Sequence, residues 1–237
     1  MRCVFVSDGR DTQVCFPKVS EIFFRFIFDT FPDFKSHMAP PLHFNKEEVE
    51  ALTNMFKSLV KKNPTSTTRP DKLERTQVRE HLHSKFGVTD DIILDRIVRV
   101  FDLDSDNYVS LSEWLQGLST FLLGSYEEKK QFCFKVYDLN DDGFITREEV
   151  FNLLKSSMTK LQTEEDPDEG IKDLVDIAIK KMDVDKDGKI SREDFSQSAD
   201  SNILYLEHFG CCLPEPKDAD KFLEEAAKYP PHHFRYY

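Results

Sequence analysis

The stretch "DLNDDGFITREE", Asp138–Glu149, decides how this sequence is interpreted. Oxygen-bearing side chains stand at its positions 1, 3, 5 and 12, and a glycine stands at position 6. A Ca²⁺ ion takes about six to eight oxygen ligands, which a 12-residue loop supplies from these positions and from the carbonyl of position 7. Gly143 permits the positive φ that the sharp turn at position 6 requires. The stretch therefore predicts a calcium loop, here called the second loop, whose ligands are Asp138, Asn140, Asp142, the carbonyl of Phe144 and Glu149.

A third loop, "DVDKDGKISRED", Asp183–Asp194, repeats the spacing but closes with an aspartate. Aspartate is one methylene shorter than glutamate, so it either binds through one oxygen or draws the loop around a smaller ion. Mg²⁺ is smaller than Ca²⁺ and prefers a tight shell of six ligands. We therefore expect Mg²⁺ as an alternative ion here, with the ligands Asp183, Asp185, Asp187, the carbonyl of Lys189 and Asp194.

A first loop, "DLDSDNYVSLSE", Asp102–Glu113, has Asn107 where the pattern has glycine. Asparagine is one of the few other residues enriched in the left-handed backbone region, so the turn is still expected. Its predicted ligands are Asp102, Asp104, Asp106, the carbonyl of Tyr108 and Glu113. The sequence thus predicts up to three Ca²⁺ sites.

Apolar residues at helical spacing flank the loops, which predicts an all-α fold of helix–loop–helix units. Such units pair through short strands, so three loops imply a fourth unit before Asp102. We place it at residues 47–86, with helices over 47–62 and 75–86, and call it the silent unit. Aligning Leu73 with position 8 puts no carboxylate at positions 1, 3, 5 and 12, which are Ser66, Thr68, Pro70 and Gln77.

Two pairs of units predict two lobes, residues 42–125 and 126–202. An irregular N-terminal extension, 1–41, precedes them, and a tail, 203–237, follows them with a short helix near 217–228. We expect the tail to cover part of an apolar groove in the second lobe. Capping-box pairs mark three helix starts: Asn45 with Glu48, Ser125 with Glu128, and Asp166 with Glu169. Two glycines, Gly87 and Gly124, mark helix ends.

Composition, charge and motifs argue against three classes of function: nucleic-acid binding, membrane anchoring and catalysis. The net charge is −12, and the three loops hold 14 acidic and 4 basic residues, so most of the acidity belongs to the loops. This distribution and the lack of a basic stripe argue against nucleic-acid binding. The sequence has no apolar run of about 18 residues, so no membrane-spanning helix is predicted. Arg2 stands where N-myristoylation requires a glycine, so no membrane anchor is expected. Five cysteines without a CxxC motif indicate reduced thiols in the cytoplasm. The sequence contains no nucleophile–base motif and no phosphate-binding loop, so it gives no indication of an enzyme.

Four units with a silent first one resemble the neuronal calcium sensor and calcineurin B groups of EF-hand proteins. The stretches "GSYEEKKQFCFKVYDLNDDGFITREE", "EEDPDEGIKDLVDIAIKKMDVDKDGKIS" and "FGCCLPEP" resemble the calaxin family more closely, over about residues 44–216. This resemblance implies a calcium sensor in the cytoplasm and cytoskeleton, on the axoneme of cilia or flagella. It implies as partners the outer-arm dynein heavy chain, docking-complex proteins and the doublet microtubule. The alternatives are a calcineurin B-like regulatory subunit of an enzyme and a calcium buffer.

The N-terminal extension is rich in phenylalanine, but its apolar residues follow neither a period of two nor one of 3.6. A sensor would have to bury both faces of such a segment. Met38 is followed directly by the first capped helix. The hypothesis is that translation starts at Met38 and that residues 1–37 come from an over-extended gene model. The alternative is a hydrophobic arm that docks on a microtubule or a dynein partner.

Overall fold

The structure is a computed structural model, and it describes residues 42–62, 71–158 and 167–229. The hypotheses on the extension and on Met38 fall outside the described residues, as do Ser66, Thr68, Pro70 and Asp166. The described residues belong to one compact unit, which covers 41–237.

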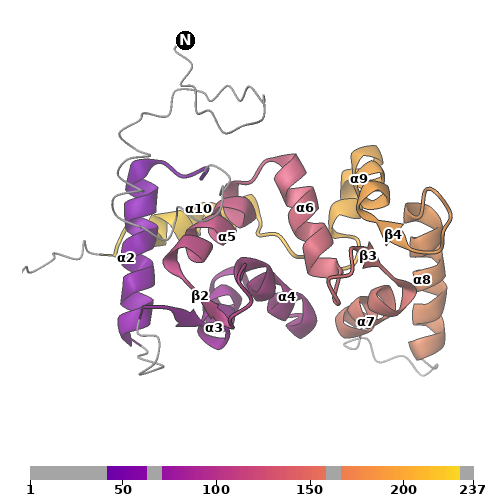
Figure 1. Cartoon of the computed structure of the whole chain (residues 1–237), viewed down its shortest axis with the longest axis horizontal. Helices are drawn as coiled ribbons and strands as arrows, with labels where there is room; N and C mark the ends of the chain where they lie inside the picture. The colour runs from indigo at the N-terminus through magenta and orange to yellow at the C-terminus, as the bar shows by residue number, and fades with distance from the viewer. Residues whose placement is uncertain (1–41, 63–70, 159–166, 230–237) are drawn as a thin grey trace, which may run out of the picture. The chain divides into compact units, whose positions relative to one another are not determined.

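The first pair of units is built around two short strands that lie antiparallel between helices (Figure 1). Leu73 faces Val109, and Glu74 faces Tyr108. This register confirms the alignment that puts Leu73 at position 8 of the silent unit. The elements are α2 (Lys46–Lys62), β1 (Leu73–Glu74), α3 (Arg75–Phe86), α4 (Asp91–Phe101), β2 (Tyr108–Val109) and α5 (Leu111–Leu123).

The second pair repeats this arrangement, with Ile145 opposite Ile190 in its strand pair. Both isoleucines are fully buried, as are Leu73 and Val109 to within a percent, because position 8 points its side chain into the core of each pair. The all-α fold with two pairs of helix–loop–helix units is therefore confirmed. The elements are α6 (Tyr126–Tyr137), β3 (Phe144–Ile145), α7 (Arg147–Met158), α8 (Pro167–Met182), β4 (Ile190–Ser191) and α9 (Arg192–Ser201).

The predicted helix starts are confirmed where they are described. The Glu48 N–H donates to Asn45 Oδ1 at 2.9 Å, and the Asn45 N–H donates to Glu48 Oε2 at 2.8 Å. Ser125 and Glu128 make the same reciprocal bonds at the start of α6. Each box satisfies backbone donors that have no partner within the first turn of a helix.

The two glycines end their helices for different reasons. Gly87 follows α3 with φ 64°, the left-handed conformation expected of a helix C-terminal glycine. Gly124 follows α5 with φ −54°, so it does not adopt that conformation. A Cβ there would lie 2.4 Å from the Thr120 carbonyl oxygen, so close backbone approach explains this glycine.

Arg96, a buried residue of α4, joins the first pair to the second. Its guanidinium donates to the carbonyl oxygens of Lys135, Val136, Asp138 and Leu139, at the end of α6. It also pairs with Asp141 at 2.7 Å. The last carbonyls of a helix lack partners within the helix, so Arg96 acts as a C-terminal cap supplied by the other pair.

The tail is more regular than predicted, since it forms the 3₁₀ helix η2 (Ile203–Glu207) and helix α10 (Pro216–Ala226). The helix predicted near 217–228 is thereby confirmed. Near η2, the rings of Phe209 and Tyr137 of α6 lie nearly perpendicular with 5.3 Å between their centroids, and the Tyr137 hydroxyl donates to the Gly210 carbonyl at 2.6 Å. The tail thus contacts the second pair, and its covering of an apolar groove there stays a prediction.

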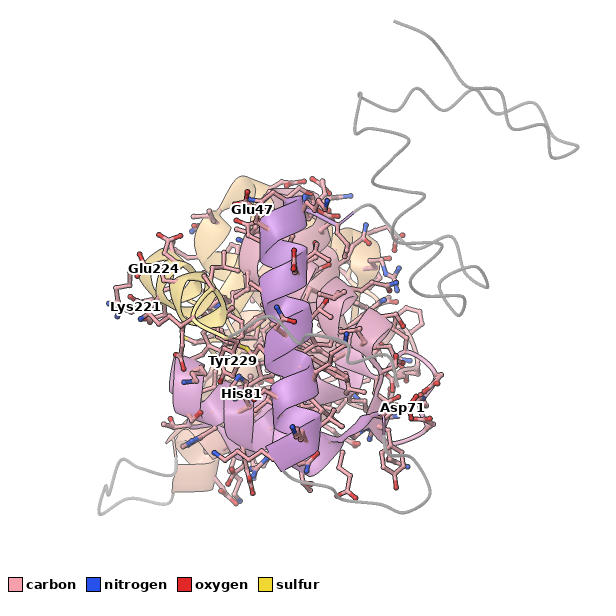
Figure 2. All side chains as sticks on the ribbon, turned by 90° about the vertical axis from the view of Figure 1, so that its left-hand side faces the viewer. Glu47, Asp71, His81, Lys221, Glu224 and Tyr229 are labelled. Carbon is pink, nitrogen blue, oxygen red and sulfur yellow. The ribbon has the colours of Figure 1, made fainter. Side chains whose placement is uncertain are left out.

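The far end of the tail packs on the first pair, which was not expected. Helix α10 contacts α2 and α3 and buries one apolar face made of Ala219, Phe222 and Ala226. Phe222 lies 5.9 Å from the His81 ring, between ring centroids, and Figure 2 shows His81 near α10, the helix that bears Lys221 and Glu224.

Candidate metal centres

The three loops share one backbone conformation. Each has positive φ at positions 4 and 6, and at position 6 the values are 67° for Asn107, 88° for Gly143 and 90° for Gly188. Asn107 therefore adopts the left-handed conformation predicted for it. Its substitution for glycine leaves the turn of the first loop intact.

Backbone N–H groups hold the first carboxylate of each loop. The Asp138 carboxylate accepts the N–H groups of Asp142 at 3.1 Å and Gly143 at 2.9 Å. Asp102 and Asp183 accept the corresponding pairs of N–H groups at 2.8–3.2 Å. These bonds fix the position-1 side chain over the turn, which preorganises the loop around its ligands.

The closing carboxylate ties the two ends of each loop together. Glu149 is buried, and its Oε1 accepts the N–H groups of Leu139 at 2.9 Å and Asn140 at 3.1 Å. Its Oε2 accepts from the backbone and the hydroxyl of Thr146, both at 2.8 Å. Glu113 makes the equivalent bonds in the first loop, to Leu103, Asp104 and Ser110.

Asp194 makes the same kind of closure with its shorter side chain. Its oxygens accept from Val184 N–H at 3.2 Å and from the Ser191 N–H and hydroxyl at 3.0 and 2.6 Å. Burial acts to raise the pKa of Asp194, but the bonds from Ser191 and Val184 outweigh it and lower that pKa. Aspartate therefore closes the third loop, and whether it selects Mg²⁺ stays a prediction.

The second and third loops offer donor sets suited to a hard cation. In the second loop, Asp138, Asn140, Asp142 and Glu149 present only oxygen ligands from carboxylates and one amide, which fits Ca²⁺. The Phe144 N–H donates to Asp142 Oδ1 at 2.9 Å, which holds residue 144 against that carboxylate. Burial raises the pKa of Asp138.

In the third loop, oxygens of Asp183, Asp185 and Asp194 all lie within 4.8 Å of one another. The N–H of Lys189 donates to Asp187 at 2.9 Å, as the position-7 N–H does in the other loops. Its ammonium lies 5.0 Å from the centroid of the Phe144 ring. Within the described parts of the chain, no lysine or arginine pairs with a ligand side chain of the second or third loop.

The first loop differs, because cations from the silent unit contact its carboxylates. Lys72 Nζ lies 2.6 Å from Asp106 Oδ2 and 3.3 Å from Asp104 Oδ2. The Arg75 guanidinium donates through Nε and Nη2 to Asp102 Oδ2, both at 2.7 Å. Sequence reasoning missed this pairing. The sequence did contain a signal for it, because the silent unit has basic residues, Lys72 and Arg75, at positions 7 and 10 of its loop.

Gln77 keeps the structural part of the position-12 role. Its Oε1 accepts the Glu74 N–H at 3.1 Å, as Glu113 accepts the Ser110 N–H in the first loop. It carries no charge, so it caps the start of α3 without offering a carboxylate. The silent unit thus keeps its structural role at this position, and that it binds no ion stays a prediction.

Two other features bear on function. Cys133 is fully buried, and its Sγ lies 3.2 Å from that of Cys212 in the tail. Among the residues that the structure describes, no helix combines the length and the apolar character needed to cross a bilayer.

Comparisons with known proteins agree with this geometry. A model described as "EF-hand domain pair" matches residues 127–199, and one described as "EF hand" matches residues 97–119. Calaxin of Xenopus laevis is 50% identical over 184 residues, which are 78% of this chain and 88% of that protein. Calaxin of Homo sapiens is 50% identical over 188 residues, 79% of this chain and 89% of that protein.

More distant relatives also match this chain in sequence. The type 2 calcineurin B protein of Homo sapiens is 32% identical over 155 residues, which cover 65% of this chain and 83% of that protein. EF-hand proteins of these kinds bind calcium and are regulatory rather than catalytic. On the identity and coverage of its relatives, the chain belongs to the calaxin family of EF-hand proteins.

Proposed function

We propose that this chain is a calcium sensor of the axoneme that regulates outer-arm dynein and hence ciliary or flagellar beating. The proposed partners are the outer-arm dynein heavy chain and docking-complex proteins on the doublet microtubule. The observation that carries the proposal is half identity with calaxins over nearly nine-tenths of their length, together with intact second and third loops. The family resemblance supplies the dynein partner, and the loops supply the calcium dependence.

The proposed switch is the opening of the second pair. Binding of an ion in a sensor-type pair changes the angle between its helices and exposes an apolar groove. The candidate groove residues are Phe134, Val150, Leu153, Leu154, Ile179 and Met182, and all but Leu154 are buried. The tail contacts helix α6 of the same pair through Phe209 and Tyr137. We therefore infer that the tail shields part of the opened groove. Deletion of residues 203–237 should increase calcium-free binding of an apolar fluorescent dye, and an unchanged signal would exclude the shield.

The partner is tested by recovering the tagged chain from ciliated cells with and without calcium, followed by mass spectrometry. A Glu149→Gln/Asp194→Asn variant, which lacks the closing carboxylates of the second and third loops, is the matched control. We expect outer-arm dynein and docking-complex proteins with the wild-type chain, in amounts that depend on calcium. Recovery without any axonemal protein would contradict the proposal.

A second candidate is a calcium-tuned regulatory protein of a phosphatase. The 32% identity with the type 2 calcineurin B protein favours it. The same recovery experiment separates the two functions, because this candidate predicts a phosphatase catalytic chain among the partners. A calcium buffer, the third alternative, predicts little calcium-dependent dye binding.

A further inference from the structure

The first loop already has cationic partners from the silent unit. Lys72 and Arg75, at positions 7 and 10 of that unit, contact all three aspartates that the first loop offers as ligands. The Asp102 side chain is 0% exposed, and those of Asp106 and Lys72 are 18% and 19% exposed. These are partly buried ion pairs, which solvent screens less than pairs on an open surface.

The second pair shows that this contact is not imposed by the fold. The third loop carries Lys189 and Arg192 at the same positions 7 and 10. There, Lys189 lies over the Phe144 ring at 5.0 Å and Arg192 over the Phe134 ring at 5.5 Å. Phe134 stands four residues before the second loop, and the corresponding residue before the first loop is Val98, which has no ring. Arg75 therefore lacks the aromatic partner that Arg192 has.

We propose that Lys72 and Arg75 are internal counter-ions that weaken calcium binding in the first loop. Calcium reaches Asp102, Asp104 and Asp106 only by displacing the ammonium and guanidinium groups that contact them. The four acidic ligand side chains of the first loop, Glu113 included, carry a charge of −4. Lys72 and Arg75 reduce the net charge of this cluster to −2. Ligand charge helps to set the affinity of such loops. The silent unit thus acts as an inhibitor of its partner loop.

This inference rests on the proposed function only in taking calcium as the ion that the loops receive. Its consequence is a ranked response, in which the second and third loops fill at lower calcium concentrations than the first. Because Lys72 precedes β1 and Arg75 begins α3, filling of the first loop would also release the three side-chain contacts that these two residues make from the silent unit to that loop.

The test uses the full chain carrying Glu149→Gln and Asp194→Asn, so that the first loop dominates binding. Terbium luminescence reports on that loop, because Tyr108 at its position 7 can sensitise a bound lanthanide, whereas the other loops have Phe144 and Lys189 there. Calcium competes with terbium, which gives the calcium affinity. Adding Lys72→Met and Arg75→Met should tighten calcium binding about tenfold, which corresponds to about 1.4 kcal/mol.

Two controls separate the counter-ions from general charge and from folding. Arg79→Met removes a cation from the same helix that pairs with Asp91 and Asp95 outside the loop, so the affinity should stay within about twofold. Lys72→Arg retains the charge at the loop and should keep most of the weak affinity. If the double variant fails to fold, as judged by circular dichroism, Lys72→Met alone makes the same test.

The outcomes are separable. An affinity in the double variant that equals or falls below that of its parent would overturn the inference, whether the parent binds tightly or not at all. Calorimetry of the wild-type chain reports on the second and third loops independently. Failure of those loops to bind calcium would count against the proposed function, while the terbium comparison would still decide the role of Lys72 and Arg75.

Discussion

The two pairs of helix–loop–helix units have the same loop backbone conformation, but the charged side chains around their loops differ. In the second pair, both loops present acidic ligands, and the third loop's Lys189 and Arg192 lie over aromatic rings. In the first pair, one loop presents the acids and the silent unit presents the cations that contact them. The difference teaches that pairing depends on an apolar residue at position 8 and a capped helix start. A helix–loop–helix unit can therefore lack metal ligands and still pair with its neighbour through its strand.

The largest effect is expected where the two pairs meet. Arg96→Met leaves four carbonyl oxygens near the end of α6 without this donor and breaks the pair with Asp141. Asp141 is half exposed and keeps Arg99, so the main cost is the loss of donors to buried carbonyl oxygens, and the free energy of unfolding should fall by about 3 kcal/mol. Urea unfolding followed by circular dichroism measures it.

Arg99→Met is the matched control for that variant. Arg99 pairs with the same Asp141, but its side chain is 47% exposed, so its loss should cost less than about 1 kcal/mol. Equal destabilisation by the two variants would show that Arg96 does not join the two pairs in the way described.

The second loop should show the next largest effect. Glu149→Gln removes the closing charge and the bidentate ligand, so calcium binding at that loop should weaken on the order of 100-fold. Glu148→Gln changes the neighbouring exposed acid, which is not a ligand, and should leave the affinity nearly unchanged. Calorimetric titration compares them, and unaltered binding in Glu149→Gln would remove the second loop from the set of calcium sites.

Acid should destabilise the first pair through His81. Burial, and then the nearby Lys85, lower the pKa of His81 to about 4 from an ordinary value of 6.5. The unfolded chain therefore takes up a proton below pH 6.5 while the folded chain does not, so stability is complete above that pH and is lost as pH falls toward 4. The loss should reach about 2 kcal/mol at pH 5.

The measurement is urea unfolding at pH 8 and pH 5 for the wild-type chain and His81→Phe. The variant should lack this part of the pH dependence, because no titratable ring remains between Trp114 and Phe222. His83→Phe, on the exposed face of the same helix, is the control and should retain it. The same pH dependence in all three chains would assign the effect to other groups.

The smallest effect sharpens the comparison within the second pair. Asp194→Glu lengthens the closing side chain of the third loop and should favour Ca²⁺ over Mg²⁺ by a few-fold, since Mg²⁺ prefers a tighter shell. Competition of Mg²⁺ against Ca²⁺ in calorimetry measures the change. An unchanged competition curve would mean that residue 194 does not set the choice of ion.

The loops and their pairing could be predicted because their signals are local. Ligand spacing located the three loops, and Leu73 at position 8 gave the register with Val109. The contacts of Lys72 and Arg75 could not be predicted, because they depend on where long side chains turn across a strand pair and on which rings compete for them. The 3₁₀ helix η2 of the tail could not be predicted either, because the apolar residues between 203 and 215 follow no single period.

The tail has a mechanical consequence. One end is fixed at Tyr137 through Phe209 and Gly210, and the other at His81 and Phe86 through Phe222. About a dozen residues connect these two anchors, so the chain closes a ring through both pairs of hands. A movement of α6 during opening pulls on this connector, and an extended chain gives only about 3.3–3.6 Å per residue. Once the slack is used, further movement must detach α10, so the length of residues 210–215 would limit the proposed calcium-driven opening of the second pair while the ring stays closed.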